Sequence, residues 1–192
     1  LGLLHPVNEP ASVTPATWVN VHIAAVVMGI TGLFGMAGLY ARQAEKAGWL
    51  GLSGFIIFSL WLAVIMSISV VEAFILPGLV TESPAYVASF LGMFTGLPSQ
   101  VDLSVLPVLW TASGLLFIAG PLLFGIATLR ARVLPRWAGV LLAVGAALIP
   151  AGGMLPPELE PLIMVPTGVA MLWLGYALFS ERQKSTQAGQ RA

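Results

Sequence analysis

Long apolar runs, separated by short polar or charged segments, dominate the pattern of the chain. The longest run extends from Trp49 to Pro77 and contains one charged residue, Glu72. About 20 apolar residues are enough for a helix to cross the hydrocarbon core of a bilayer. The pattern therefore predicts an all-α, polytopic transmembrane helix bundle within residues 1–180. Its five spans are expected at about residues 17–40, 49–77, 103–129, 135–155 and 161–179.

The segments between these spans are mostly short. Residues 42–48 and 130–136 are charged and are expected to form loops. Residues 181–192 are polar and lack periodicity, so we expect a mobile cytoplasmic tail there.

The longer connection between the second and third spans contains a further helix signal. Ser83 and Pro84 are typical of a helix start, and the apolar residues that follow fall on one helical face. The stretch is too short to cross a bilayer, so an interfacial helix is predicted at about residues 84–95.

Two prolines interrupt predicted spans. Pro121 lies inside the third span, and Pro150 lies near the end of the fourth, followed by Ala151 and two glycines. Because proline removes one backbone hydrogen bond and crowds the preceding turn, kinks are predicted at both positions.

Composition supports lipid as the solvent. Hydrophobic residues make up 58% of the 192 residues and charged residues only 8%, whereas soluble domains carry roughly a quarter charged residues. The net charge is zero, which gives no basis for nucleic-acid binding. The chain has no cysteine, which excludes disulfides and thiolate metal sites.

The basic residues predict an orientation. All eight fall in the first–second loop, the third–fourth loop and the C-terminal tail, which five spans place on one side: Arg42, Lys46, Arg130, Arg132, Arg136, Arg182, Lys184 and Arg191. By the positive-inside rule this side is cytoplasmic and the N-terminus lies outside, in the cell membrane. Apolar residues 1–4 are compatible with the end of a preceding signal peptide or of a sixth span, and the sequence leaves both open.

His22 and Glu72 are the first candidates for chemistry. His22 lies about five residues into the first span, and Glu72 five residues before Pro77 on a span of opposite direction. At 1.5 Å per residue both lie roughly 7–8 Å below the outer boundary. A contact between them is predicted, because a carboxylate inside a membrane needs a partner. The alternative is that Glu72 reaches the interface alone and His22 bonds a backbone carbonyl.

His5 and Asp102 belong to the same outer side in this topology. Together with His22 and Glu72 they are candidate ligands for a proton, a cation or a divalent metal such as zinc or iron. The sequence contains no His-Glu-x-x-His motif, and no residue is predicted to be catalytic.

Small residues mark one side of the first span. We expect them to pack against another helix: Ala25, Gly29, Gly32, Gly35 and Gly38. The alternative is that a flat cofactor lies on the glycines, with His22 as an axial ligand to a haem.

Two loop segments carry a family resemblance. Gly38–Glu45 (GLYARQAE) and Leu134–Gly139 (LPRWAG) resemble loops of uncharacterised bacterial multi-pass membrane proteins. The resemblance implies a bacterial plasma membrane and no activity.

Three functions are compatible with these features. The first is a small structural, accessory or ligand-binding subunit of a homo-oligomer or larger membrane complex. The second is a small proton- or cation-coupled transporter that uses an outward-facing site at His22 and Glu72. The third is a membrane-embedded metal or haem protein.

Overall fold

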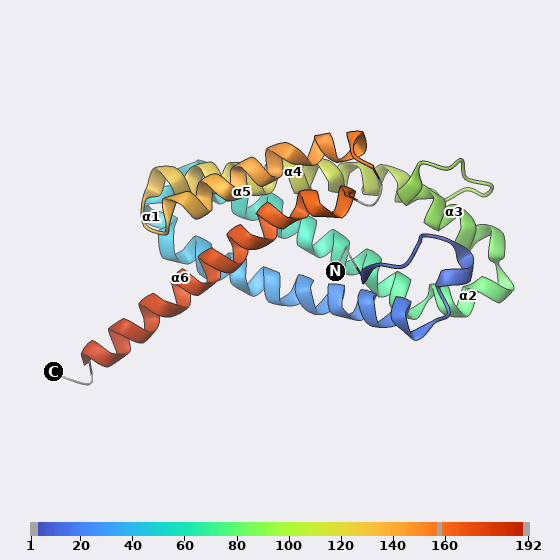
Figure 1. Ribbon diagram of the computed structural model, residues 1–192, viewed down its shortest axis with the longest axis horizontal. Helices are drawn as coiled ribbons and strands as arrows, with labels where there is room; N and C mark the ends of the chain where they lie inside the picture. Colours follow the sequence, from blue (N-terminus) through green and yellow to red (C-terminus); the bar gives the residue numbers. More distant parts are fainter. Residues whose placement is uncertain (1–3, 157–158, 190–192) are drawn as a thin grey trace. The chain divides into compact units, whose positions relative to one another are not determined.

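The computed structural model describes residues 4–156 and 159–189, and these residues form an all-α protein (Figure 1). The α-helices are α1 (Ala16–Phe74), α2 (Leu76–Glu82), α3 (Pro84–Thr95), α4 (Leu106–Ala131), α5 (Arg136–Leu148) and α6 (Val165–Gly189). The 3-10 helices are η2 (Pro10–Ser12), η3 (Ile149–Met154) and η4 (Glu160–Met164).

Four helical segments in the described residues are long and apolar enough to cross a membrane. They are Ala16–Phe74, Leu106–Ala131, Arg136–Met154 and Pro161–Glu181. Large apolar side chains on them are exposed, including Phe34, Leu115, Leu172 and Phe179. A protein with this much exposed apolar surface on long helices is suited to lipid contact, which agrees with a multi-pass membrane protein.

The chain forms two compact units. Unit 1 comprises Leu1–Gly32 and Trp61–Leu115, and unit 2 comprises Leu33–Leu60 and Leu116–Ala192. Helices α1 and α4 contribute residues to both units, so each unit is described by itself.

Helix α1 reverses at one residue, Gly48, which has φ +57° and ψ −160° (Figure 1). We call residues 16–47 its first arm and residues 49–74 its second arm. The prediction of a loop over residues 42–48 was wrong, because residues 42–47 are helical. Gln43, Ala44 and Lys46 have good helix propensity, so the helix continues past the apolar run. Glycine takes the positive φ without a steric penalty and confines the turn to one position.

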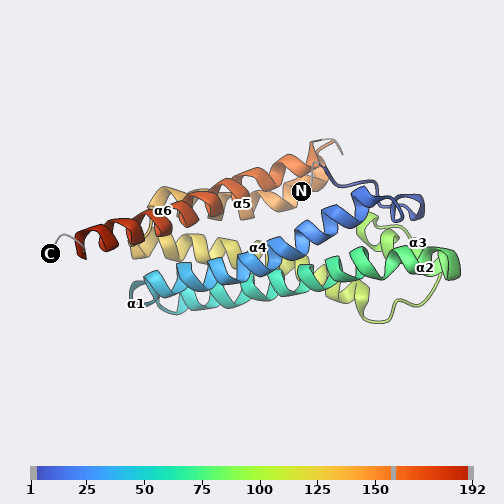
Figure 2. The same cartoon turned by 90° about the horizontal axis from the view of Figure 1, so that it is seen from below.

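The two arms run antiparallel. In unit 1, Gly29 faces Met66, and a Cβ placed on Gly29 would lie 2.9 Å from that of Met66. In unit 2, the Tyr40 ring stacks on Phe55 with centroids 4.8 Å apart. Within each unit the paired segments of the two arms lie side by side (Figure 2), and the chain joins them through the turn at Gly48 as a helical hairpin.

The other small residues of the first arm have different surroundings. Gly32 contacts the Leu62 side chain of the second arm, at 3.1 Å from a Cβ placed on the glycine. Gly38 faces Leu178 of α6, Gly35 has no atom within 4 Å of such a Cβ, and Ala25 is half-buried.

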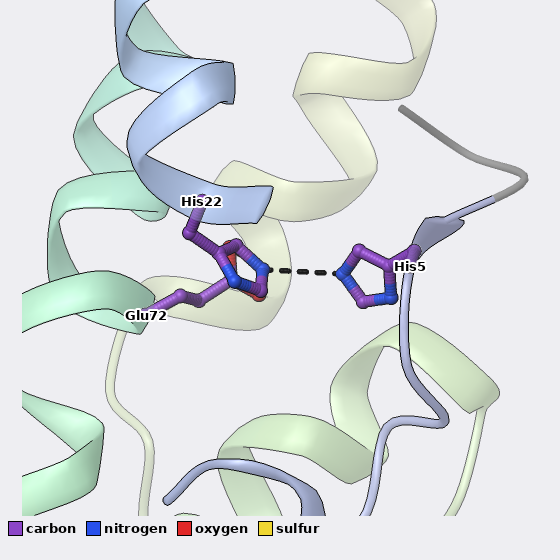
Figure 3. Close-up of side chains that lie close together, drawn as sticks. All are labelled: His5, His22 and Glu72. Carbon is purple, nitrogen blue, oxygen red and sulfur yellow. Dashed lines mark hydrogen bonds and ion pairs between the residues drawn. The ribbon is translucent and has the colours of Figure 1, made fainter. Parts of the chain in front are cut away.

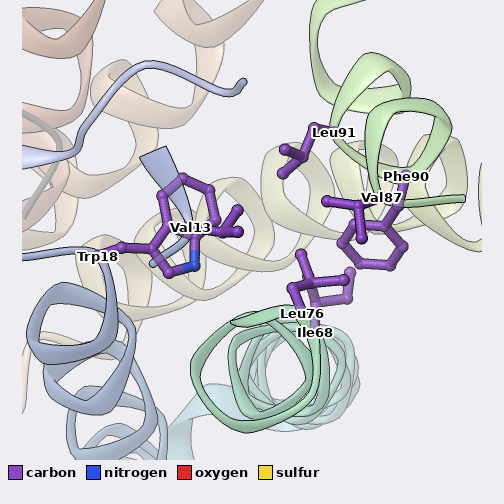
Figure 4. Packing of buried hydrophobic residues seen from close by; sticks show 7 residues of the cluster. All are labelled: Val13, Trp18, Ile68, Leu76, Val87, Phe90 and Leu91. Carbon is purple, nitrogen blue, oxygen red and sulfur yellow. The ribbon is translucent and has the colours of Figure 1, made fainter. Parts of the chain in front are cut away.

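A hydrophobic cluster in unit 1 joins the start of the chain to α1, α2 and α3 (Figure 4). Its buried members are Val13, Trp18, Ile68, Leu76, Val87, Phe90 and Leu91. Helix α3 covers the same residues as the predicted helix 84–95 and ends at Gly96, which has φ +72°. Its location at a membrane interface stays a prediction.

In unit 2, small residues bring helix backbones together. A Cβ on Gly120 would lie 2.6 Å from the backbone nitrogen of Phe58, and one on Gly125 2.5 Å from the carbonyl oxygen of Gly139. No side chain fits at these positions, which is typical of tightly packed membrane helices.

Both prolines fall within helical segments. Helix α4 continues through Pro121, whereas α5 ends at Leu148 and gives way to η3, which contains Pro150. At the C-terminal end, α6 continues through Gly189 and includes most of the segment predicted as a tail. The remainder of that segment, residues 190–192, lies outside the described residues.

Candidate metal site

Three side chains in unit 1 converge on one point: His5 from the segment before η2, His22 from the first arm and Glu72 from the second (Figure 3). His5 Nε2 lies 3.1 Å from His22 Nε2, and His22 Nε2 lies 3.2 Å from Glu72 Oε2. One potential ligand atom from each residue lies within 4.8 Å of the others. Within the described ranges no other residue joins this group.

The group is largely removed from solvent. His22 is 2% exposed and Glu72 6%, and His5 is half-buried. The alternative in which Glu72 reaches the interface without a partner therefore does not describe this structure. Burial of a carboxylate is costly unless it is paired, so the site needs a positive charge beside Glu72.

Backbone carbonyls fix both imidazole rings. His5 Nδ1 lies 2.6 Å from the carbonyl oxygen of Pro6, and His22 Nδ1 lies 2.7 Å from that of Trp18. A carbonyl oxygen only accepts, so each Nδ1 carries the hydrogen and donates it. In a neutral ring the other nitrogen, Nε2, is then an unprotonated acceptor. This is the arrangement that orients most metal-binding histidines.

These tautomers leave the three facing atoms without a hydrogen bond among them. With both rings neutral, two Nε2 lone pairs and a carboxylate oxygen face one another and no hydrogen lies between them. Such atoms repel at 3.1 and 3.2 Å unless a cation sits among them. Either a metal ion or one extra proton removes the conflict.

Burial lowers the pKa of His5 below its usual value. The neighbouring His22 acts in the same direction, while the Pro6 carbonyl and Glu72 act against both. The balance favours the neutral ring of His5.

Trp18 is a residue that sequence reasoning did not identify as part of the site. Its indole Nε1 donates to the backbone carbonyl of Glu72 at 2.9 Å. Its ring centroid lies 4.4 Å from that of His22 and 5.4 Å from that of His5. The Trp18-x-x-x-His22 spacing, one helical turn, was the available signal. Trp18 therefore contacts both histidine rings and bonds the backbone of Glu72.

Asp102 does not join the group. Its Oδ1 accepts the backbone N–H of Ser104 at 2.7 Å, in the exposed turn that precedes α4. A carboxylate that accepts a hydrogen bond from its own turn is a common local motif in turns. The prediction that Asp102 lies at the site is not supported by its position.

The haem alternative conflicts with packing. At Gly29 and Gly32 the second arm already covers the small-residue surface, with Met66 and Leu62 in contact. A flat ring system has no room there.

Comparisons with protein families, with curated proteins and with solved structures found no match.

Proposed function

We propose that this protein is a multi-pass membrane protein that binds one divalent transition-metal ion through His5 Nε2, His22 Nε2 and the Glu72 carboxylate. The observation that carries the proposal is the convergence of His5 Nε2, His22 Nε2 and a Glu72 carboxylate oxygen, which are all acceptors when both rings are neutral. Both rings are already fixed in the tautomer that presents Nε2 to a metal.

The spacing of the ligand atoms fits a first coordination shell. Zinc binds histidine nitrogen at about 2.0–2.1 Å with tetrahedral angles, which puts neighbouring ligands roughly 3.3 Å apart. The two separations from His22 Nε2, 3.1 and 3.2 Å, are close to this value, and all three ligand atoms lie within 4.8 Å of one another. Two imidazoles and one carboxylate suit zinc or ferrous iron, and three protein ligands leave a position free for water or another small ligand.

A proton is the competing occupant, and the His22–Glu72 distance of 3.2 Å supports it. With a hydrogen on Nε2, His22 would be a cation that forms an ion pair with the Glu72 carboxylate. His5 Nε2 would then be a second acceptor for the same hydrogen. The protein would then be a candidate for a proton-coupled transporter. The two occupants differ in one measurable way, because only a metal requires His5 for binding.

For the membrane topology we propose five spans, with α1 crossing twice. The hairpin at Gly48 supports two crossings, since each arm is long enough to span alone. The eight basic residues support a cytoplasmic C-terminus and an external N-terminus. The resemblance of residues 38–45 and 134–139 to loops of bacterial membrane proteins supports a bacterial plasma membrane. Glu72 and His22 then lie in the outer part of the membrane. Assembly into an oligomer or a larger membrane complex remains a proposal that the mass of the purified particle tests.

The test uses the full-length protein in detergent with a purification tag that contains no histidine. After treatment with a chelator, zinc is added in competition with an indicator of known affinity. We expect one zinc per chain, and at least about 100-fold weaker binding for Glu72→Gln.

Glu82→Gln is the matched control, because Glu82 is an exposed carboxylate in the same unit. It should bind zinc like the unmodified protein. Equal loss in both variants, or no stoichiometric binding at all, would overturn the metal proposal. Binding of iron in preference to zinc, with the same dependence on Glu72, would keep the site and change its metal.

A further inference from the structure

Unit 2 contains an open cavity of about 570 Å³ lined by Leu129, Arg130, Arg132 and Arg136. Leu129 and Arg130 belong to the last turn of α4, Arg132 to the connecting segment, and Arg136 to the first turn of α5. Three arginines therefore line one cavity, and none of these residues takes part in the candidate metal site.

The three arginines have no counter-charge in the part of the chain that the structure describes. The ion pair of unit 2 joins Arg42 to Glu181 at 2.8 Å and leaves them out. Arg136 lies over the Trp137 ring, 5.4 Å from its centroid, which is a contact with an aromatic face and not with an anion. Like charges gathered without a partner repel, so this cavity favours a negatively charged ligand.

The backbone conformation of Arg132 also supports a ligand-binding role for this cavity. Arg132 has φ +54°, and its N–H bonds the carbonyl of Thr128 at 3.2 Å, which closes the end of α4. Glycine is the usual residue in this left-handed position, because a side chain there is strained. An arginine at such a position suggests that its side chain is needed there.

The surroundings favour a ligand that is both anionic and apolar. Leu129 lines the cavity and is 37% exposed, and Trp137, in contact with Arg136, is 59% exposed. The start of α5 adds the positive end of a helix dipole. Arginine presents several donors in a geometry that matches phosphate oxygens.

We propose that this cavity binds the phosphate of an anionic phospholipid, whose acyl chains lie against Leu129 and Trp137. Basic pockets at helix ends on the cytoplasmic side of a membrane are suited to such headgroups. A soluble phosphate ester shares the phosphate chemistry but would gain nothing from the exposed apolar side chains.

The experiment measures lipid retention by the full-length protein in detergent by native mass spectrometry, with phosphatidylglycerol and phosphatidylcholine as probes. We expect preferential retention of phosphatidylglycerol, and at least about tenfold weaker retention by Arg132→Gly. This variant removes one guanidinium and relieves the positive φ, so it should fold at least as well as the original. Combining Arg130→Gln, Arg132→Gly and Arg136→Gln should abolish the preference.

Arg42→Gln is the control, because Arg42 is a basic residue of the same unit that already has a carboxylate partner. It should keep the lipid preference. Equal loss in Arg42→Gln and Arg132→Gly would show a diffuse charge effect and overturn the proposal. Displacement of the lipid by millimolar inorganic phosphate would assign the site to a free phosphate and would also overturn it.

Discussion

The candidate metal site and the arginine cavity carry opposite kinds of chemistry. In unit 1, His5, His22 and Glu72 bring together three potential ligand atoms for a cation. In unit 2, Arg130, Arg132 and Arg136 bring three positively charged residues to one cavity.

They also differ in burial and orientation. His22 and Glu72 are buried and both histidine rings are fixed by backbone carbonyls, whereas all three arginines are exposed. Electrostatic interactions are strong in a buried site and are screened by salt at an exposed one. The first site is therefore able to select a small ion by geometry, and the second is suited to a large, diffuse anionic group.

The largest effect is expected when both histidines are removed. The double variant His5→Ala, His22→Ala leaves only the Glu72 carboxylate, so zinc affinity should fall by more than about 1,000-fold, to that of an isolated carboxylate. Competition with an indicator measures the affinity. Circular dichroism and gel filtration in detergent show whether the variant keeps its helices, and a folded variant with unchanged affinity would contradict the assignment.

A substitution of His5 distinguishes a bound metal from a bound proton. His5→Ala removes one of three ligands and leaves the His22–Glu72 contact in place, so we expect zinc affinity to fall by about 10- to 100-fold. Other first-arm positions provide a background comparison, such as Asn20→Ala, since Asn20 is exposed. If His5→Ala binds zinc normally, the cation at this site does not use the N-terminal segment.

A substitution of Trp18 tests how strongly the residues around the ligands affect stability and zinc affinity. Trp18→Phe keeps an aromatic ring beside both histidines but removes the indole donor to the Glu72 carbonyl. An unsatisfied buried acceptor costs about 1–3 kcal/mol, so the free energy of unfolding should fall by that amount. Because the Trp18 carbonyl that orients His22 remains, zinc affinity should change less than tenfold. A larger loss of affinity than in His5→Ala would make Trp18 more important than a ligand and would contradict this ranking.

The smallest effect is expected for an exposed ion pair. Arg42 and Glu181 are 45% and 40% exposed and are paired at 2.8 Å. Solvent and salt screen such pairs, which contribute about 0–1 kcal/mol. Arg42→Gln should therefore shift the thermal midpoint by only a few degrees or less, a result that a fluorescence melt can check.

Much of the fold class follows from the sequence, because apolar runs of sufficient length have few alternatives to membrane helices. The turn between the first two runs was harder to predict. Four of the six residues 42–47 are polar or charged, yet the helix propensity of this segment extends the helix to Gly48, where a positive φ ends it. The number of spans and their orientation stay predictions.

The contact between His22 and Glu72 could be predicted from the sequence, because both residues lie at similar distances from the ends of two antiparallel helices. The place of His5 was less constrained, because the segment before α1 has no periodic structure to fix it. Trp18 and Asp102 show the limit of this reasoning. One side chain hydrogen-bonds across 54 residues of sequence, and the other accepts a bond from its own turn.

The most direct measurement is the X-ray absorption fine structure of the zinc-loaded, full-length protein. A site built from His5, His22 and Glu72 predicts imidazole scattering from two histidines and one carboxylate oxygen, with ligands at roughly 2.0–2.2 Å. The imidazole signal should disappear in the His5→Ala, His22→Ala variant. A shell of oxygen atoms alone, unchanged by that variant, would contradict the metal site.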